Sequence, residues 1–203
     1  MTGYHAGIAV LLAWCSLACP PVLAATNDDT GRDTNSVGGG PGFRSQSDVL
    51  AWRSAWRRGL APGRLIGDSW RVEYDREVSI SLWKAHVSDQ ANRSGGSDQT
   101  FIGATSRGVR LYARPRFDGR IRPFVEAGIG LAWFQHKDLA SEDVHEGALG
   151  SHLLFEDRLE AGLRFPGLHG LELKAMLVHY SNANLGDRND GENLRMLTIA
   201  LPF

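Results

Sequence analysis

Hydrophobic and polar residues alternate along most of the chain after about residue 48. Near the C-terminus, Leu197, Ile199, Leu201 and Phe203 occupy every second position. The stretch Leu153–Phe165 places an apolar series against a charged series in the same way. Successive side chains of a strand point to opposite faces, so this period of two predicts β-strands with one apolar face.

The same alternation marks three further stretches, at residues 70–82, 109–114 and 125–133. Between the alternating stretches lie clusters rich in Gly, Pro, Asn and Asp, at residues 92–97, 115–119, 137–150, 166–170 and 182–191. These residue types favour turns, because their backbones or side chains stabilise reversals of the chain. The pattern therefore predicts an all-β fold of roughly seven clear strands and one weaker strand.

Residues 1–25 have the features of a secretory signal peptide. An apolar run at residues 6–18 leads to a small-residue pattern that ends at Ala25, although no Lys or Arg precedes the run. Both cysteines, Cys15 and Cys19, lie inside this segment, so the mature chain would contain no thiol and no disulfide. Cleavage before Cys19, as in lipoproteins, is the alternative.

Charge and hydropathy narrow the classes of protein that the chain can represent. The 203 residues carry a formal net charge of −1 at pH 7, which gives no reason to expect a nucleic-acid partner. After residue 25, no run approaches the ~20 apolar residues that a transmembrane helix requires. If the mature chain enters a bilayer, we expect a closed barrel, because only helices and barrels satisfy all backbone polar groups in lipid.

Alternation alone does not separate a membrane barrel from a soluble one, and a periplasmic sandwich or lipocalin-like barrel is the alternative. The signal segment favours the membrane, as do tryptophans near strand ends and the aromatic terminus Phe203, which resembles the assembly signal of bacterial outer-membrane barrels. Those tryptophans are Trp56, Trp70, Trp83 and Trp133. We predict an eight-stranded antiparallel transmembrane β-barrel over residues 48–203 in the bacterial outer membrane, preceded by a flexible lead with a weak first strand over 26–47.

The stretch His179-Tyr180-Ser181-Asn182-Ala183 carries the candidate chemistry. Residues i and i+2 of a strand share a face, so His179 and Ser181 are expected side by side, as general base and nucleophile. The pair shares the apolar parity of Leu171, Leu173, Ala175 and Leu177, which predicts that it faces lipid. A polar pair there is costly, which favours a functional role over a simple exit of the strand into the headgroups.

With Asn189-Asp190-Gly191-Glu192 that follows, this stretch resembles the C-terminal motifs of the lipid A 3-O-deacylase (PagL) family of outer-membrane enzymes. The resemblance extends to residues 123–130 and 155–163. It implies an ester hydrolase that removes the 3-hydroxyacyl chain at the 3-position of lipid A through a Ser-His-acid mechanism. It also implies lipid A or lipopolysaccharide as substrate, and no cofactor. The remaining histidines lack a metal-ligand spacing, so no metal site is expected.

The acid is where the chain departs from the family pattern. Family members carry a Glu two residues after the motif's Gly, whereas here Glu192 directly follows Gly191 and Asn193 stands in the expected place. A one-residue shift reverses the face of a strand, so Glu192 reaches His179 only through a turn or a bulge. We favour Glu192, because a carboxylate stabilises an imidazolium better, and keep Asn193 as the alternative. Asp187 and Asp190 are lesser candidates, since both suit the turn.

Oxyanion donors are expected from Asn182 or Asn189, or from a loop backbone N–H, with turn formation as the alternative role of both asparagines. A non-catalytic structural or adhesion barrel that binds partners through loops 89–99 and 137–150 is the competing function. The basic residues Arg53, Arg57, Arg58 and Arg64 are assigned either to lipid A phosphates or to interfacial solubility. A homodimer is left open.

Overall fold

A computed structural model describes residues 33–41, 49–60, 63–85, 99–113, 119–137, 149–185 and 191–202. Its strands are β1 (Thr34–Pro41), β2 (Val49–Gly59), β3 (Arg64–Ile66), β4 (Trp70–Ala85), β5 (Gln99–Ala113), β6 (Arg122–Phe134), β7 (Leu153–Phe165), β8 (Leu171–Ser181) and β9 (Glu192–Pro202). The predicted signal segment, Asn189 and Phe203 fall outside the described residues.

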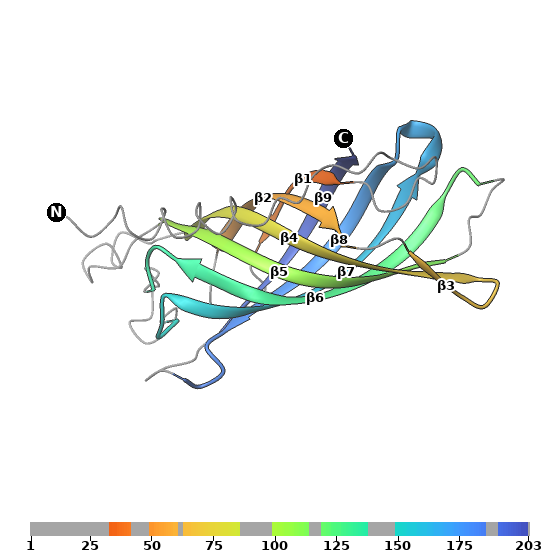
Figure 1. The fold of residues 1–203 in the computed structure, drawn as a ribbon. Coiled ribbons are helices and arrows are strands. Elements are labelled where there is room, and N and C mark those ends of the chain that lie inside the picture. The colour runs from red at the N-terminus through yellow and green to blue at the C-terminus, as the bar shows by residue number, and fades with distance from the viewer. Residues whose placement is uncertain are drawn as a thin grey trace.

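Eight of these strands form a closed antiparallel barrel (Figure 1). From β4 to β9 each strand pairs with the next along the chain, β1 pairs with both β2 and β9, and β2 pairs with β4 to complete the ring. The three-residue strand β3 pairs with the first residues of β4, in a hairpin that extends one end of the sheet. The predicted eight-stranded antiparallel barrel is thus confirmed.

The barrel begins at β1, ahead of residue 48 where the sequence pattern placed its start. Gly38, Gly39 and Gly40, which the sequence suggested as part of a flexible lead, lie within this strand. A Cβ atom added at Gly38 or Gly40 would collide with the backbone of β9. The glycine run therefore allows β1 to approach β9 closely enough to close the ring, although it lacks the alternation that marks the other strands.

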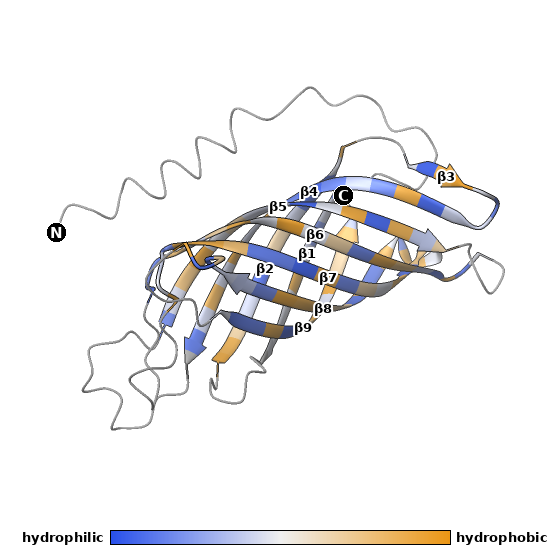
Figure 2. Cartoon of the chain, turned by 90° about the horizontal axis from the view of Figure 1, so that it is seen from below, coloured by the Kyte–Doolittle hydropathy of each residue, from blue (hydrophilic) through white to orange (hydrophobic). Residues whose placement is uncertain are grey.

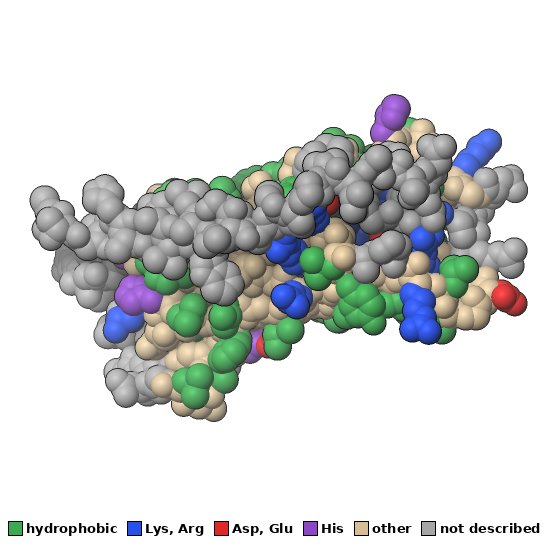
Figure 3. Space-filling model, in the orientation of Figure 1, with side chains coloured by type: hydrophobic (Ala, Val, Ile, Leu, Met, Phe, Trp, Pro, Cys, Tyr) green, Lys and Arg blue, Asp and Glu red, His purple; other side chains and the backbone are tan. Residues whose placement is uncertain are grey.

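The faces of the barrel are inverted relative to a soluble protein. Along the strands, hydrophobic and hydrophilic positions alternate (Figure 2). Large apolar side chains such as Ile80, Ile129 and Leu197 are exposed on the outside, whereas Arg110 and Glu126 are buried inside. On the face drawn in Figure 3, hydrophobic side chains form several patches, with Lys and Arg side chains between them and few acidic ones in view. This is the arrangement of a barrel that sits in lipid, and it differs from the soluble barrel that the sequence left as the alternative.

The lumen is apolar toward the end where β8 leads into β9. Buried side chains from seven strands and the segment before β7 fill it there: Val49, Ala51, Trp83, Ile102, Ala104, Ala132, Phe134, Leu149, Leu154, Met176, Val178, Tyr180, Leu194 and Met196. Trp83 is fully buried and packs edge-on against Phe134 and Tyr180, with ring centroids 5.3 Å apart in both pairs. The prediction that Trp83 belongs to an interfacial girdle is therefore wrong, because its position on β4 has inward parity.

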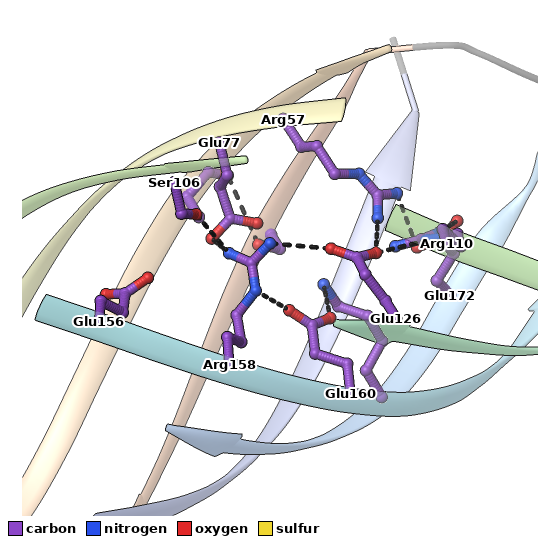
Figure 4. Close-up of polar contacts among 12 residues, drawn as sticks. Arg57, Glu77, Ser106, Arg110, Glu126, Glu156, Arg158, Glu160 and Glu172 are labelled. Carbon is purple, nitrogen blue, oxygen red and sulfur yellow. Dashed lines mark hydrogen bonds and ion pairs between the residues drawn. The ribbon is translucent and has the colours of Figure 1, made fainter. Parts of the chain in front are cut away.

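A network of ion pairs fills the middle of the lumen (Figure 4). Glu126 contacts three cations, with N–O distances of 2.7 Å to Arg57, 2.6 Å to Arg110 and 2.8 Å to Arg158. Arg53 contacts Glu156 at 2.9 Å. Two of the arginines considered as phosphate contacts, Arg53 and Arg57, are thus buried among carboxylates and cannot reach a lipid from the lumen, whereas Arg64 is exposed.

The short 3-10 helix η2 (Pro166–Leu168) forms the turn between β7 and β8. His169 and Gly170 follow in the left-handed region, with φ of 55° and 80°, and the Gly170 N–H donates to the Phe165 carbonyl at 3.1 Å. No helix of the described residues has the length and apolarity needed to cross a membrane. This tight turn lies at the opposite end of β8 from Ser181.

Candidate active site

Strand β8 presents His179 and Ser181 on the outer face and Tyr180 on the inner face. The Tyr180 hydroxyl donates to Glu156 at 2.8 Å and accepts from Arg53 at 3.0 Å. Its ring also packs on the apolar core of the lumen. Tyr180 therefore anchors the end of β8 from within, and this fixes the direction in which its two neighbours point. The sequence motif alone did not reveal this role of its middle residue.

Asn193 holds the imidazole of His179. The two residues are direct cross-strand partners on β8 and β9, and His179 Nδ1 lies 2.9 Å from Asn193 Oδ1. With Oδ1 as the acceptor, Nδ1 carries the ring proton and donates it to the amide. The lone pair then resides on Nε2, which is the tautomer that a general base for Ser181 requires.

Ser181 lies on the same outer face as His179 and is partly exposed. Two residues along a strand span about 6.5 Å, which is close enough for side chains to meet by rotation. Both side chains belong to the described part of the chain, and no hydrogen bond joins them in this structure. Catalytic hydrogen bonds are often formed only in the complex with substrate, so this separation is compatible with a nucleophile–base pair.

A tight turn follows Ser181 and determines the role of Asn182. The Leu185 N–H donates to the Asn182 carbonyl at 3.0 Å, and the intervening Ala183 and Asn184 have φ of 53° and 61°. The Asn182 side chain is buried, accepts from the Asn184 N–H at 2.9 Å and donates to the Leu149 carbonyl at 3.3 Å. These contacts lie on the inner side and match the turn-forming alternative.

Glu192 lies on the opposite face of β9 from Asn193. Its side chain is buried in the lumen, where Glu192 is the cross-strand partner of Tyr180, and its Oε1 accepts from the Asn193 N–H at 3.2 Å. The structure brings Asn193, and not Glu192, against the imidazole. The strand begins at Glu192 without a bulge, so the one-residue shift in the sequence reverses the side to which the carboxylate points.

Apolar residues surround the His179–Ser181 pair on the outer face, among them Phe155 and Leu159 on β7 and Leu177 on β8. Two charged residues interrupt this surface: Asp157, the cross-strand partner of His179 on β7, and Arg195 on β9. The sequence reasoning missed Asp157, because only the strand register brings it beside the histidine. No group of three His, Cys, Asp or Glu residues suited to a metal ion occurs within the described ranges.

We expect that Gly191→Ala lowers activity about tenfold, because Gly191 lies against the imidazole. Its φ is +56°, and an added Cβ would lie 3.2 Å from His179 Cε1. The methyl group would strain the backbone and displace the ring from Asn193, and small displacements of a catalytic group cost one to two orders of magnitude in rate. Steady-state ester hydrolysis measures the effect, and Gly119→Ala, also at positive φ but in open space, is the matched control. Equal activity of both variants would contradict the prediction.

Comparison with known proteins identifies the family of this chain. Residues 50–202, from β2 to the end of β9, match the model of the family described as lipid A 3-O-deacylase (PagL). Lipid A deacylase PagL of Pseudomonas aeruginosa is 42% identical over 83 residues, which cover 41% of this chain and 44% of that relative. The match thus spans less than half the length of the curated relative.

Among solved structures, one shares the fold of this barrel and a second is less similar. The crystal structure of the outer membrane enzyme PagL superposes with a TM-score of 0.69 at 24% identity, covering 84% of this chain and 99% of the other. Neisserial surface protein A gives a TM-score of 0.43 at 11% identity, covering 85% and 95%. The family match takes in seven of the eight barrel strands and both sides of the His179–Asn193 contact, and on this basis the chain belongs to the lipid A 3-O-deacylase (PagL) family.

Proposed function

We propose that this protein is an outer-membrane hydrolase that removes the ester-linked 3-hydroxyacyl chain at the 3-position of lipid A. The observation that carries the proposal is the contact of 2.9 Å between His179 and Asn193, beside Ser181 on the outer face of the barrel. An oriented imidazole next to a serine is the arrangement required for nucleophilic attack on an ester. Family membership and the names of the relatives support the substrate class.

The reaction proceeds in two proton-balanced steps. The Ser181 hydroxyl attacks the ester carbonyl while His179 Nε2 accepts its proton, and the imidazolium then returns that proton to the departing sugar oxygen. This leaves an acyl group on Ser181. Water next attacks the acyl carbonyl, His179 takes the water proton and passes it to the serine oxygen, and a 3-hydroxy fatty acid leaves. The side chains supply every proton transfer, so no cofactor is required.

The outward direction of the site suits a membrane lipid as substrate. Leu177, Phe155 and Leu159 extend the apolar surface next to the pair, and an acyl chain can lie against them without leaving the bilayer. Ser181 is the last residue of β8, where the strand enters the loop toward β9. An ester near the headgroups can therefore reach the hydroxyl by lateral movement.

The tetrahedral intermediate needs hydrogen-bond donors near Ser181. We assign this role to Asn189, which lies outside the described residues, and to a backbone N–H of the loop after Ser181 other than those of Asn184 and Leu185, which donate to Asn182. Asn182 is assigned to the turn, because its amide is occupied on the inner side. The orienting role falls to Asn193 in preference to Glu192, on the basis of the contact with His179 Nδ1.

Mass spectrometry of lipid A from an outer membrane that contains the protein tests this function. The wild type should remove one 3-hydroxyacyl mass, and fragmentation should assign the loss to the 3-position. Loss from another position would overturn the proposed regiochemistry. Unchanged lipid A alongside correctly folded wild-type protein would overturn the proposed hydrolase function. It would favour the alternative, a non-catalytic structural or adhesion barrel.

A further inference from the structure

We propose that Asp157 supplies the negative charge that stabilises the His179 imidazolium, while the neutral Asn193 only orients the ring. The assignment of these two roles rests on the proposed hydrolase function. It would make Asp157 a positioning and electrostatic residue that serves the reaction through His179.

The strand register places Asp157 next to His179. The two are direct partners on β7 and β8, just as His179 and Asn193 are on β8 and β9. Side chains of direct antiparallel partners on one face have Cβ atoms about 4.5–5.5 Å apart. The imidazole therefore lies between an amide on one neighbouring strand and a carboxylate on the other.

No stabilising contact with the described residues accounts for a carboxylate at position 157. Its side chain is exposed on the outer face and makes no hydrogen bond or ion pair with any other described residue. Its neighbours on that face are Phe155 and Leu159 along β7 and Ile129 across on β6. A carboxylate without a charged partner on an apolar outer face is unfavourable, which makes a functional role the first hypothesis to test.

The chemistry of the site supplies a reason for this carboxylate. His179 becomes a cation during the attack of Ser181, and Asn193 cannot neutralise that charge because its side chain is an amide. The exposed Arg195 on β9, two residues after Asn193, adds a positive charge that opposes the cation. Among the described outward residues of β7, β8 and β9, Asp157 is the only acid next to His179. The carboxylate thus offsets both cationic charges.

The same β7 segment shows how the two faces of the sheet divide their roles. Glu156 and Arg158 point inward and join the buried ion pairs, with Glu156 contacting Arg53 and Tyr180. Asp157, between them, points outward. Two residues of this charged run, Glu156 and Arg158, therefore form ion pairs in the lumen, whereas Asp157 lies on the outer face beside His179.

A rescue experiment on the full-length barrel in detergent micelles, with purified lipid A as substrate, tests the inference. Asp157→Asn should lower kcat about 10- to 100-fold at neutral pH. Loss of the nearby negative charge disfavours the imidazolium, so the acidic limb of the kcat/KM profile should move to lower pH. Asn193→Glu in the Asp157→Asn background should restore activity and move the limb back. Asp157→Glu should keep most of the activity.

Asp157→Leu separates charge from folding. Leucine suits the lipid-facing surface, so this variant should fold at least as well as the wild type and yet be as slow as Asp157→Asn. A wild-type rate and pH profile in folded Asp157→Asn would overturn the role of Asp157 while leaving the hydrolase intact. Failure of Asn193→Glu to rescue would also overturn it. A wild type without activity toward lipid A would instead refute the proposed function.

Discussion

Ser181→Ala should abolish ester hydrolysis, lowering kcat on the order of 10⁴-fold or more. The substitution removes the oxygen that attacks the ester, and water cannot replace it at the same position relative to His179. Ser181 is partly exposed and forms no side-chain hydrogen bond with the described residues, so its replacement leaves no buried group unpaired. The barrel should therefore fold as the wild type does. Release of the 3-hydroxy acid, followed by mass spectrometry, measures the rate.

Ser54→Ala is the matched control. Ser54 also faces outward, on β2, so Ser54→Ala makes the same chemical change on the same outer surface of the barrel. Because Ser54 lies on another strand than His179, no loss of activity is expected. His179→Gln should be nearly as slow as Ser181→Ala, and the double variant no slower, because nucleophile and base act as one unit. If Ser181→Ala turns over lipid A at an unchanged rate, another nucleophile is responsible.

Strand periodicity, together with the signal segment and the aromatic terminus, predicted the barrel, and parity predicted the outward direction of His179 and Ser181. Parity along β8 alone separates His179 and Ser181 from Tyr180, and it required no knowledge of the neighbouring strands. Parity could not identify which residue of β9 contacts the imidazole. Whether Glu192 or Asn193 faces His179 depends on the residue at which β9 begins and on a register fixed by the whole sheet, and a shift of one residue exchanges them.

The roles of several other residues depend on partners from distant strands, which a local sequence pattern does not identify. Arg53 and Arg57 were assigned to lipid A phosphates or to interfacial solubility, because only the closed ring brings them to Glu156 on β7 and Glu126 on β6. Asp157 was missed for the same reason, because only the pairing of β7 with β8 brings it next to His179. Trp83 was assigned to the interface from its place near a strand end, whereas its inward parity on β4 was the better guide.

Arg158→Met should lower the free energy of unfolding by about 3–5 kcal/mol, because removing one partner leaves buried charges uncompensated. The Arg158 guanidinium contacts Glu77, Glu126 at 2.8 Å and Glu160 at 2.8 Å, and donates to Ser106 at 3.1 Å. It lies at the centre of the network (Figure 4). Urea titration of the folded barrel in micelles, followed by tryptophan fluorescence, measures the loss. Arg107→Met is the control, because Arg107 faces outward on β5 and its removal from the lipid surface should not destabilise.

A second substitution shows whether charge or volume causes the loss. Glu77 also contacts Arg53 at 2.9 Å, so it keeps one cation when Arg158 is replaced. In the double variant Arg158→Met, Glu77→Gln one buried carboxylate is removed together with one buried cation, so the charge of the lumen is balanced again. Part of the stability should return, since replacing both members of a buried pair costs less than replacing one. If the double variant is less stable than Arg158→Met by the full cost of a second independent change, the loss comes from packing in the lumen. Recovery means that the balance of buried charge holds the eight strands around the surface that carries His179 and Ser181.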